Sequence, residues 1–131
     1  MVGALFDTNI LIDHLNAVPQ ARKELDRFEK RAISIITWME VMVGADADLV
    51  EPTRRFLDGF EMIALNDEIA SRAVTLRRSH RITLPDAVIW ATAQTAGLLL
   101  VTRNTKDFPA DDPGIREPYA LDAPTPPSLT V

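Results

Sequence analysis

The hydrophobic and polar positions of the chain follow two alternating patterns. Residues 2–6 and 98–101 form continuous apolar runs, and the segments 32–36 and 60–65 are mostly apolar, with one polar residue each. Continuous runs of this length are typical of strands that are covered on both faces. Between the runs, apolar residues recur at helical spacing in segments near 8–15, 19–31, 37–44, 52–59, 66–80 and 83–96. The alternation predicts an α/β fold with a mostly parallel central sheet of four or five strands and helices on both faces.

The end of the chain has a different composition. Six of the nine prolines lie between residues 109 and 127, and proline is incompatible with the interior of a regular helix. We expect an edge strand around residues 115–119, followed by a loose tail. The sequence therefore predicts one domain at residues 1–120 and a Pro-rich C-terminal tail at residues 121–131.

Composition narrows the class of protein. A chain of 131 residues with 47% hydrophobic side chains is typical of one globular domain. The absence of cysteine excludes a disulfide framework and a thiolate metal site, so the expected compartment is the cytoplasm. The longest uncharged stretch, residues 87–102, is shorter than the ~20 apolar residues that a membrane span needs, so no membrane segment is expected. The net charge of -5 argues against non-specific attraction to nucleic acid.

Four acidic residues stand at junctions between the expected elements. Asp7 closes the first strand, Glu40 follows the second, Asp86 lies in the first turn of an apolar helix, and Asp107 follows the fourth strand. Ligands of parallel α/β sheets collect beyond the carboxyl ends of the strands. We therefore expect these four carboxylates to share one pocket at that edge of the sheet.

Such a pocket predicts a particular chemistry. Ionised carboxylates within ~4–6 Å of one another repel, and a bound cation relieves the repulsion. Oxygen ligands without cysteine favour a hard cation, Mg²⁺ or Mn²⁺. Metal ions held in this way activate water for the hydrolysis of phosphodiesters. The candidate metal ligands and catalytic residues are Asp7, Glu40, Asp86 and Asp107.

The same acids also fit an interpretation as helix caps. Thr37-x-x-Glu40 and Thr83-x-x-Asp86 match a capping pattern, and Asp7 precedes a predicted helix. For any one of these acids, capping is the better explanation, but capping does not explain why all three recur at one edge of the predicted sheet. Asp107 is equally compatible with a solvated loop acid and with a ligand.

Four short motifs follow one another between residues 2 and 108. They are Asp7-Thr8-Asn9 after a strand, Thr37 to Glu40 with Gly44, Leu84-Pro85-Asp86-Ala87, and a last group containing Thr102, Asn104, Asp107 and Phe108. In this order the motifs resemble those of the PIN-domain nucleases, and among them the VapC-type toxins of type II toxin–antitoxin pairs. The resemblance implies a single PIN-like domain.

The resemblance also implies an activity and partners. It implies a Mg²⁺- or Mn²⁺-dependent endoribonuclease in which Asp7, Glu40 and Asp86 hold the cation and Asp107 completes the pocket. Thr8 and Asn104 would support the site by hydrogen bonds or through metal-bound water, and Asn104 occupies a position that could replace Asp107 as the fourth ligand. The implied partners are an RNA substrate, a second copy of the chain in a homodimer, and a cognate VapB-type antitoxin that covers the active site. Operator DNA would be bound only through the antitoxin.

Basic residues on two predicted helices offer a second kind of candidate site. Local positive potential can attract RNA in a chain whose net charge is negative, although such residues are as often solvated helix faces. The candidates for substrate binding are Lys23, Arg27, Arg77, Arg78 and Arg81.

Two other classes of protein compete with the nuclease. A signalling receiver module is also a small α/β domain with an acidic Mg²⁺ pocket, but receivers carry paired acids after the first strand, where this chain has Asp7-Thr8. A receiver also carries a phosphoacceptor aspartate after a middle strand. In this chain the only candidate for that aspartate is Asp67, in Asn66-Asp67. The other alternative is a catalytically inactive PIN-like binding domain, and the presence of Asp7, Glu40 and Asp86 argues against it.

Overall fold

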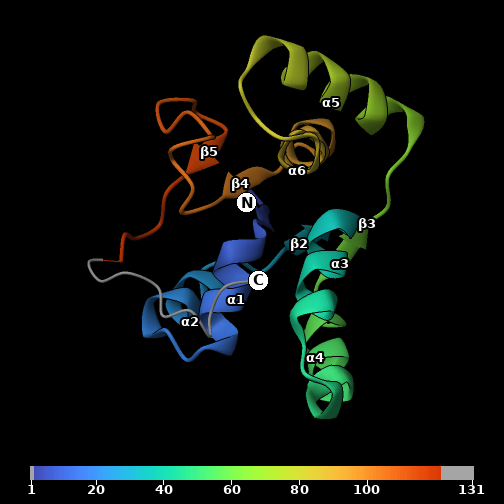
Figure 1. The fold of residues 1–131 in the computed structure, drawn as a ribbon. Helices are drawn as coiled ribbons and strands as arrows, with labels where there is room; N and C mark the ends of the chain where they lie inside the picture. Colours follow the sequence, from blue (N-terminus) through green and yellow to red (C-terminus); the bar gives the residue numbers. More distant parts are fainter. Residues whose placement is uncertain (1, 122–131) are drawn as a thin grey trace.

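In the computed structural model, which describes residues 2–121, the strands form one parallel sheet (Figure 1). The strands are β1 (Ala4–Phe6), β2 (Arg31–Ser34), β3 (Glu61–Ile63), β4 (Leu99–Val101) and β5 (Ile115–Arg116). Within the described residues their order is β3-β2-β1-β4-β5, and each neighbouring pair is parallel. The central strand β1 is fully buried, as its uninterrupted apolar sequence predicts.

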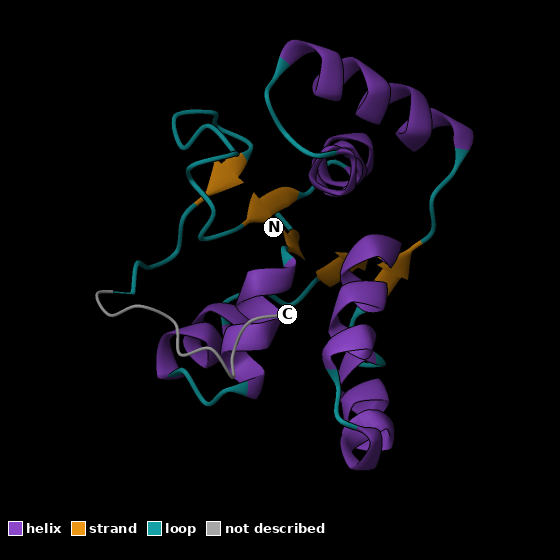
Figure 2. Ribbon diagram, viewed as in Figure 1, coloured by secondary structure: helices purple, strands orange, loops and turns teal. Residues whose placement is uncertain are grey.

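Helices cover both faces of this sheet, as predicted. They are α1 (Thr8–Leu15), α2 (Pro19–Asp26), α3 (Ile35–Gly44), α4 (Val50–Leu57), α5 (Asp67–Ser79) and α6 (Leu84–Ala96), with a short 3₁₀ turn, η1 (Ala47–Leu49), before α4. Helices α5 and α6 lie on one side of the sheet, and α1 to α4 lie on the other (Figure 2). The sequence therefore predicted the layers of the fold correctly.

Each face of the sheet has its own apolar core. On the α5–α6 side, Trp90 is buried and packs edge-on against Phe108, with ring centroids 5.9 Å apart. On the other side, Phe6 packs edge-on against Phe28 and Phe60, and Leu57 of α4 is buried beside them. Trp90 belongs to the first of these cores, and the partly buried Trp38 packs against the second.

The boundary between β2 and α3 differs from the prediction. The expected strand at residues 32–36 ends at Ser34, whose hydroxyl oxygen accepts a hydrogen bond from the Ile36 backbone N–H at 3.1 Å and caps α3. Ile35 and Ile36 are therefore helical in spite of their β propensity. Glu40 lies in the interior of α3, so the interpretation of Thr37-x-x-Glu40 as a cap is wrong.

Other boundaries are shifted by tertiary contacts. The helix expected at 19–31 ends at Asp26, because Arg31 already pairs with Ala4 in the sheet. The edge strand expected at 115–119 contains only Ile115–Arg116. The limits of α6 agree with the prediction, with Thr83 as N-cap and Gly97 in the left-handed conformation at φ 67°.

Two further expectations concern the C-terminal tail and membrane-spanning segments. The predicted tail at 121–131 lies, from residue 122 onward, outside the described residues. No helix within residues 2–121 combines the length and the apolar character needed to cross a membrane.

Candidate active site

The four predicted carboxylates come from elements that reach the same edge of the sheet. Asp7 directly follows the central strand β1, Glu40 lies on the helix after β2, and Asp107 lies in the loop after β4. Helix α6 leads into the start of β4, so its first turn, with Asp86, lies at the opposite end of that strand. This end is the carboxyl edge of the sheet, where ligands of parallel sheets bind.

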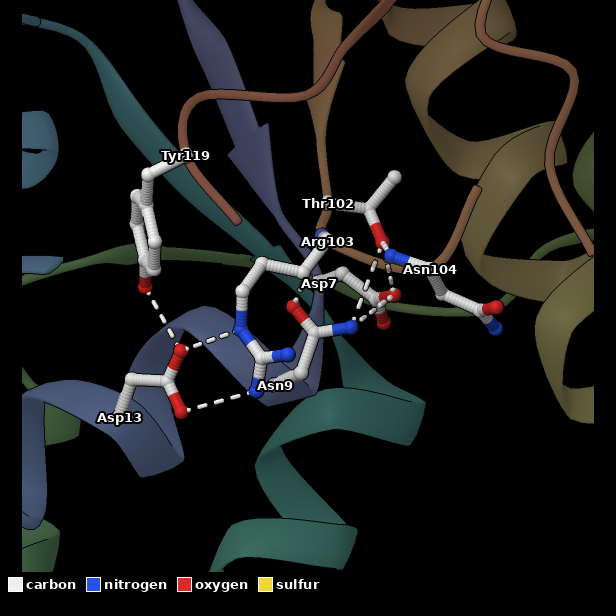
Figure 3. A network of polar contacts seen from close by, with 7 residues as sticks. All are labelled: Asp7, Asn9, Asp13, Thr102, Arg103, Asn104 and Tyr119. Atoms are coloured by element: carbon white, nitrogen blue, oxygen red, sulfur yellow. Dashed lines mark hydrogen bonds and ion pairs between the residues drawn. The ribbon is translucent and has the colours of Figure 1, made fainter. Parts of the chain in front are cut away.

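Asp7 is the most buried of the four, with 4% of its surface exposed. Its Oδ1 accepts a hydrogen bond from the Thr8 backbone N–H at 2.8 Å. Its Oδ2 accepts from the Thr102 hydroxyl at 2.7 Å and from the Asn9 side-chain amide at 3.2 Å (Figure 3). These bonds leave about one of the roughly four acceptor sites of a carboxylate free. Asp7 therefore caps α1, as the capping interpretation predicted, and is also held by residues from the far end of the chain.

Burial of Asp7 raises its pKa from the ordinary 3.8 to about 6, and the negative charges of Asp86 and Glu40 contribute to the rise. The hydrogen bonds from Thr102 and Thr8 oppose it by stabilising the ionised form. Because desolvation outweighs these hydrogen bonds, the ionised form of Asp7 is less favoured in the folded chain than in the unfolded chain, and nearby positive charge would stabilise it.

Glu40 is linked to the start of α1. The Thr8 hydroxyl donates to Glu40 Oε1 at 2.6 Å and lies 3.0 Å from the Thr37 hydroxyl oxygen. Thr37 is fully buried, whereas Glu40 is partly exposed. The Thr8 hydroxyl therefore orients the carboxylate of Glu40.

Asp86 and Asp107 form the other half of the site. Partial burial raises the pKa of Asp86, and the charges of Asp107 and Glu40 raise it further, while the Thr83 hydroxyl lowers it. The Asn104 side-chain amide donates to Asp107 Oδ2 at 3.0 Å, and the Asp107 backbone N–H donates back to Asn104 Oδ1 at 3.3 Å. Asn104 therefore orients the carboxylate of Asp107.

The negative charge at this edge is not balanced by basic side chains. Of the ion pairs formed within residues 2–121, none includes Asp7, Glu40, Asp86 or Asp107. In the same residues no three acidic or histidine side chains lie close enough to hold one ion as they stand. The structure thus brings the four acids within range of one another's charge but does not bring them to ligand spacing. An all-oxygen, uncompensated donor set still fits a hard divalent cation.

The five basic candidates do not form a single surface. Lys23 and Arg27 lie on α2 and at its end, whereas Arg77, Arg78 and Arg81 lie at the end of α5 and just after it. All five are exposed. Since α2 and α5 are on opposite sides of the sheet (Figure 1), one continuous basic patch would not contain them all.

Two buried ion pairs near the site were not predicted. Asp13 of α1 binds Arg103, and Glu24 of α2 binds Arg116, each through two hydrogen bonds. In the sequence, each pair was indicated only by an acid at a helix position that faces the core. Asp13 stands three residues after the buried Ile10, and Glu24 stands three residues after the buried Ala21. Such an acid requires a partner, but the sequence does not indicate which one.

The two histidines lack the partners that metal binding would need. His14 stacks on Phe56, with ring centroids 4.9 Å apart, and His80 packs edge-on against Trp90 at 4.8 Å. Burial lowers the pKa of His14. Both histidines therefore pack against aromatic rings.

Comparison with known proteins decides the family. The profile described as PIN domain matches residues 4–110. The chain belongs to the PIN-domain family. It is 34% identical over 125 residues to Ribonuclease VapC10 of Mycobacterium tuberculosis, an alignment that covers 89% of this chain and 93% of the relative.

Solved structures support the same assignment. This PIN domain is similar to a chain of a toxin–antitoxin complex from Klebsiella pneumoniae, with 49% identity, a TM-score of 0.87, and coverage of 91% of this chain and 100% of the other. It is also similar to a chain of DNA-bound VapBC from Salmonella typhimurium, with 26% identity, a TM-score of 0.71, and coverage of 88% and 96%.

The receiver alternative is wrong. Besides the family assignment, the sheet order places β3 at an edge of the sheet, so Asn66-Asp67 does not follow a middle strand as a phosphoacceptor must. Asp67 instead lies in the exposed first turn of α5, which Asn66 caps.

Proposed function

We propose that this PIN domain is the toxin of a type II toxin–antitoxin pair and acts in the cytoplasm as a Mg²⁺- or Mn²⁺-dependent endoribonuclease. Membership of the family supports the proposal, as does the similarity to a protein named a ribonuclease and to chains of toxin–antitoxin complexes. The observation that carries it is the set of four uncompensated carboxylates at the carboxyl edge of the sheet.

The residues of this edge would divide the work as follows. Asp7, Glu40, Asp86 and Asp107 would hold the cation, with Thr8 orienting Glu40 and Asn104 orienting Asp107. Thr102 and Asn9 hold Oδ2 of Asp7 in one direction. When bound, the cation supplies an activated water and stabilises the oxygen that leaves phosphorus. A water would add to phosphorus as one P–O ester bond of the RNA breaks.

The partners follow from the same proposal. We assign RNA as substrate, and Lys23, Arg27, Arg77, Arg78 and Arg81 as residues that could contact its phosphates from either side of the domain. A VapB-type antitoxin would bind the toxin and carry the contacts to operator DNA. An acidic chain suits a basic partner, because complementary potentials speed association.

A homodimer is proposed on the basis of an apolar surface on α3 and the turn after it. Met39 and Val43 project apolar side chains that are 42% and 84% exposed, and Leu49 of η1 is 49% exposed. Apolar side chains that are exposed together are a feature of surfaces that bind other proteins. A second copy of this chain would cover them.

The nuclease is tested by replacing single acids of the edge. Asp86→Asn and Asp7→Asn should each reduce Mn²⁺-dependent cleavage of a structured RNA by at least about 100-fold, because each removes a charge that holds the cation. Cleavage of an end-labelled RNA, with chelator as a blank, measures the effect.

Asp67→Asn is the matched control, because it makes the same change in the first turn of another helix, and the charge of Asp67 is not among those that raise the pKa of Asp7 or of Asp86. It should leave cleavage unchanged. If Asp86→Asn cleaves as fast as Asp67→Asn, the proposed active site is wrong. If the wild-type chain binds Mn²⁺ and RNA but cleaves no RNA, the inactive binding domain is the correct alternative.

A further inference from the structure

We propose that Arg103 is a positioning residue. Its ion pair with Asp13, to which the Tyr119 hydroxyl also donates, fixes the direction in which the side-chain amide of Asn9 holds the carboxylate of Asp7. The inference rests on the proposed function, since it assigns Arg103 a part in preparing the acidic edge. Arg103 itself does not touch any of the four carboxylates of that edge in the contacts of residues 2–121.

The side chain of Arg103 is held firmly at its far end. Its Nε and Nη2 donate to the two oxygens of Asp13 at 2.6 and 3.0 Å, and the Tyr119 hydroxyl donates to Asp13 Oδ2 at 2.7 Å (Figure 3). Asp13 is 4% exposed. A planar guanidinium bound by both carboxylate oxygens has a defined direction as well as a favourable energy.

The backbone of the same residue faces the acidic edge. The Arg103 N–H donates to Asn9 Oδ1 at 3.2 Å. An N–H accepts no hydrogen bond, so this contact requires the oxygen of the Asn9 amide on that side and the NH₂ group on the other. The NH₂ group then donates to Asp7 Oδ2 at 3.2 Å and to Thr102 Oγ1 at 3.3 Å. The position of residue 103 therefore determines that the NH₂ group of Asn9, and not its oxygen, faces Asp7 Oδ2.

The tripeptide Thr102-Arg103-Asn104, which follows strand β4, depends on these contacts for its position. Thr102 and Asn104 flank Arg103 and belong to no helix or strand, and the Asn104 N–H donates to Thr102 Oγ1 at 2.9 Å. Thr102 in turn donates to Asp7, and Asn104 to Asp107. The Asp13–Arg103 pair thus fixes the middle residue of a tripeptide whose neighbours each contact an acid of the site.

Within the described residues, the chain also contains a comparable ion pair that does not contact Asn9. Its link toward the site is a backbone hydrogen bond beside the sheet, from the Thr102 N–H to the Arg116 carbonyl oxygen at 3.1 Å, which Arg116→Lys leaves in place. Glu24 is 3% exposed and is bound through two hydrogen bonds by Arg116, at 2.6 and 3.1 Å, with Arg27 as a third contact. Within residues 2–121, no side-chain hydrogen bond leads from Glu24 or Arg116 to the four acids. A substitution of Arg116 therefore removes a comparable ion pair without disturbing Asn9.

The experiment compares Arg103→Lys with Arg116→Lys in the full chain. Lysine keeps the charge and loses the two-pronged contact, so both variants are expected to fold. Arg103→Lys should weaken Mn²⁺ binding, measured by calorimetry with the metal alone, by about tenfold, the lower end of the effect of residues that orient metal ligands. It should lower kcat by a similar factor and change KM less than about twofold. Arg116→Lys should leave all three at their wild-type values.

Two further measurements separate positioning from a general loss of structure. In a chain that already carries Asn9→Ala, adding Arg103→Lys should change Mn²⁺ affinity less than about twofold, because the path to Asp7 is already broken. Without metal, the NMR signals of the Asn9 side-chain amide should shift in Arg103→Lys and in Tyr119→Phe, and stay in place in Arg116→Lys.

The inference is overturned if Arg103→Lys and Arg116→Lys change Mn²⁺ affinity and kcat equally, or if the effects of Asn9→Ala and Arg103→Lys multiply. Failure of the proposed function gives a different result. The wild-type chain would then neither bind Mn²⁺ nor cleave RNA, while the metal-free amide signals of Asn9 would still respond to Arg103→Lys.

Discussion

Two groups of acids in this PIN domain have opposite surroundings, although Asp7 of one group and Asp13 of the other lie at the two ends of the same helix segment. Asp13 and Glu24 are almost completely buried, and each is neutralised by an arginine. Asp7 is equally buried, but hydrogen-bond donors without charge surround it, and burial, with a smaller contribution from the charges of Asp86 and Glu40, raises its pKa to about 6. The fold neutralises the first group and leaves the second group without an ion-pair partner within the described residues.

The energetic consequences of the two arrangements differ in sign. A buried ion pair contributes little net stability, but removing one partner leaves an uncompensated charge and is costly. At the acidic edge the ionised carboxylates already lack compensation, so removing a charge there relieves repulsion. Substitutions in the two groups should therefore change the free energy of unfolding in opposite directions.

The largest expected effect comes from breaking a neutralised pair. Arg116→Met leaves Glu24 buried with only Arg27 beside it, and should reduce the free energy of unfolding by about 3 to 5 kcal/mol. Urea denaturation without metal measures it. Arg54→Met removes an exposed pair with Glu51, at 3.8 Å, and should cost no more than about 1 kcal/mol. Equal losses in the two variants would contradict the distinction between buried and exposed pairs.

A smaller effect concerns the dependence of stability on pH. The folded pKa of Asp7, about 6, lies above its ordinary value of 3.8, so the folded state keeps the proton longer than the unfolded state. As pH rises from about 4 to about 6, Asp7 therefore reduces the free energy of unfolding, by up to about 3 kcal/mol, and it has no further effect above that range.

Asp7→Asn isolates this contribution, because its side chain does not titrate. The difference in unfolding free energy between wild type and Asp7→Asn, measured by denaturation at several pH values without metal, should fall across that window. Saturating Mg²⁺ should reduce the fall, since a cation that binds the ionised form replaces the proton. A difference that does not vary with pH would mean that Asp7 ionises normally in the folded chain.

The smallest expected effect distinguishes the two interpretations of Asp86. If repulsion at the edge dominates, Asp86→Asn should raise metal-free stability by about 0.5 kcal/mol, the scale of interactions between partly exposed charges. It should also reduce the rise in Tm that Mn²⁺ produces. If Asp86 serves only the first turn of α6, the substitution should instead lower stability, by about 0.5 kcal/mol or more.

The layers of the fold and the family could be predicted from sequence, because both depend on patterns that are local. Thr83 caps α6 and Gly97 ends it as their residue types predict, and the apolar run before Asp7 forms the central strand. The predicted cap at Thr37 was wrong, because Ser34 lies three residues earlier and closes the strand first. Two capping residues so close together have similar propensities, and the register of β2 in the sheet decides between them.

The sequence by itself determined where strands and helices alternate, since periodicity and capping act over a few residues. Only the tertiary structure decided which acids are neutralised. Arg103 reaches Asp13 across 90 positions and Thr102 reaches Asp7 across 95. Contacts at such separations follow from the order of strands in the sheet, and no local pattern encodes them. The same order left Asp7 buried among neutral donors beside other acids, and so determined the charge of the site.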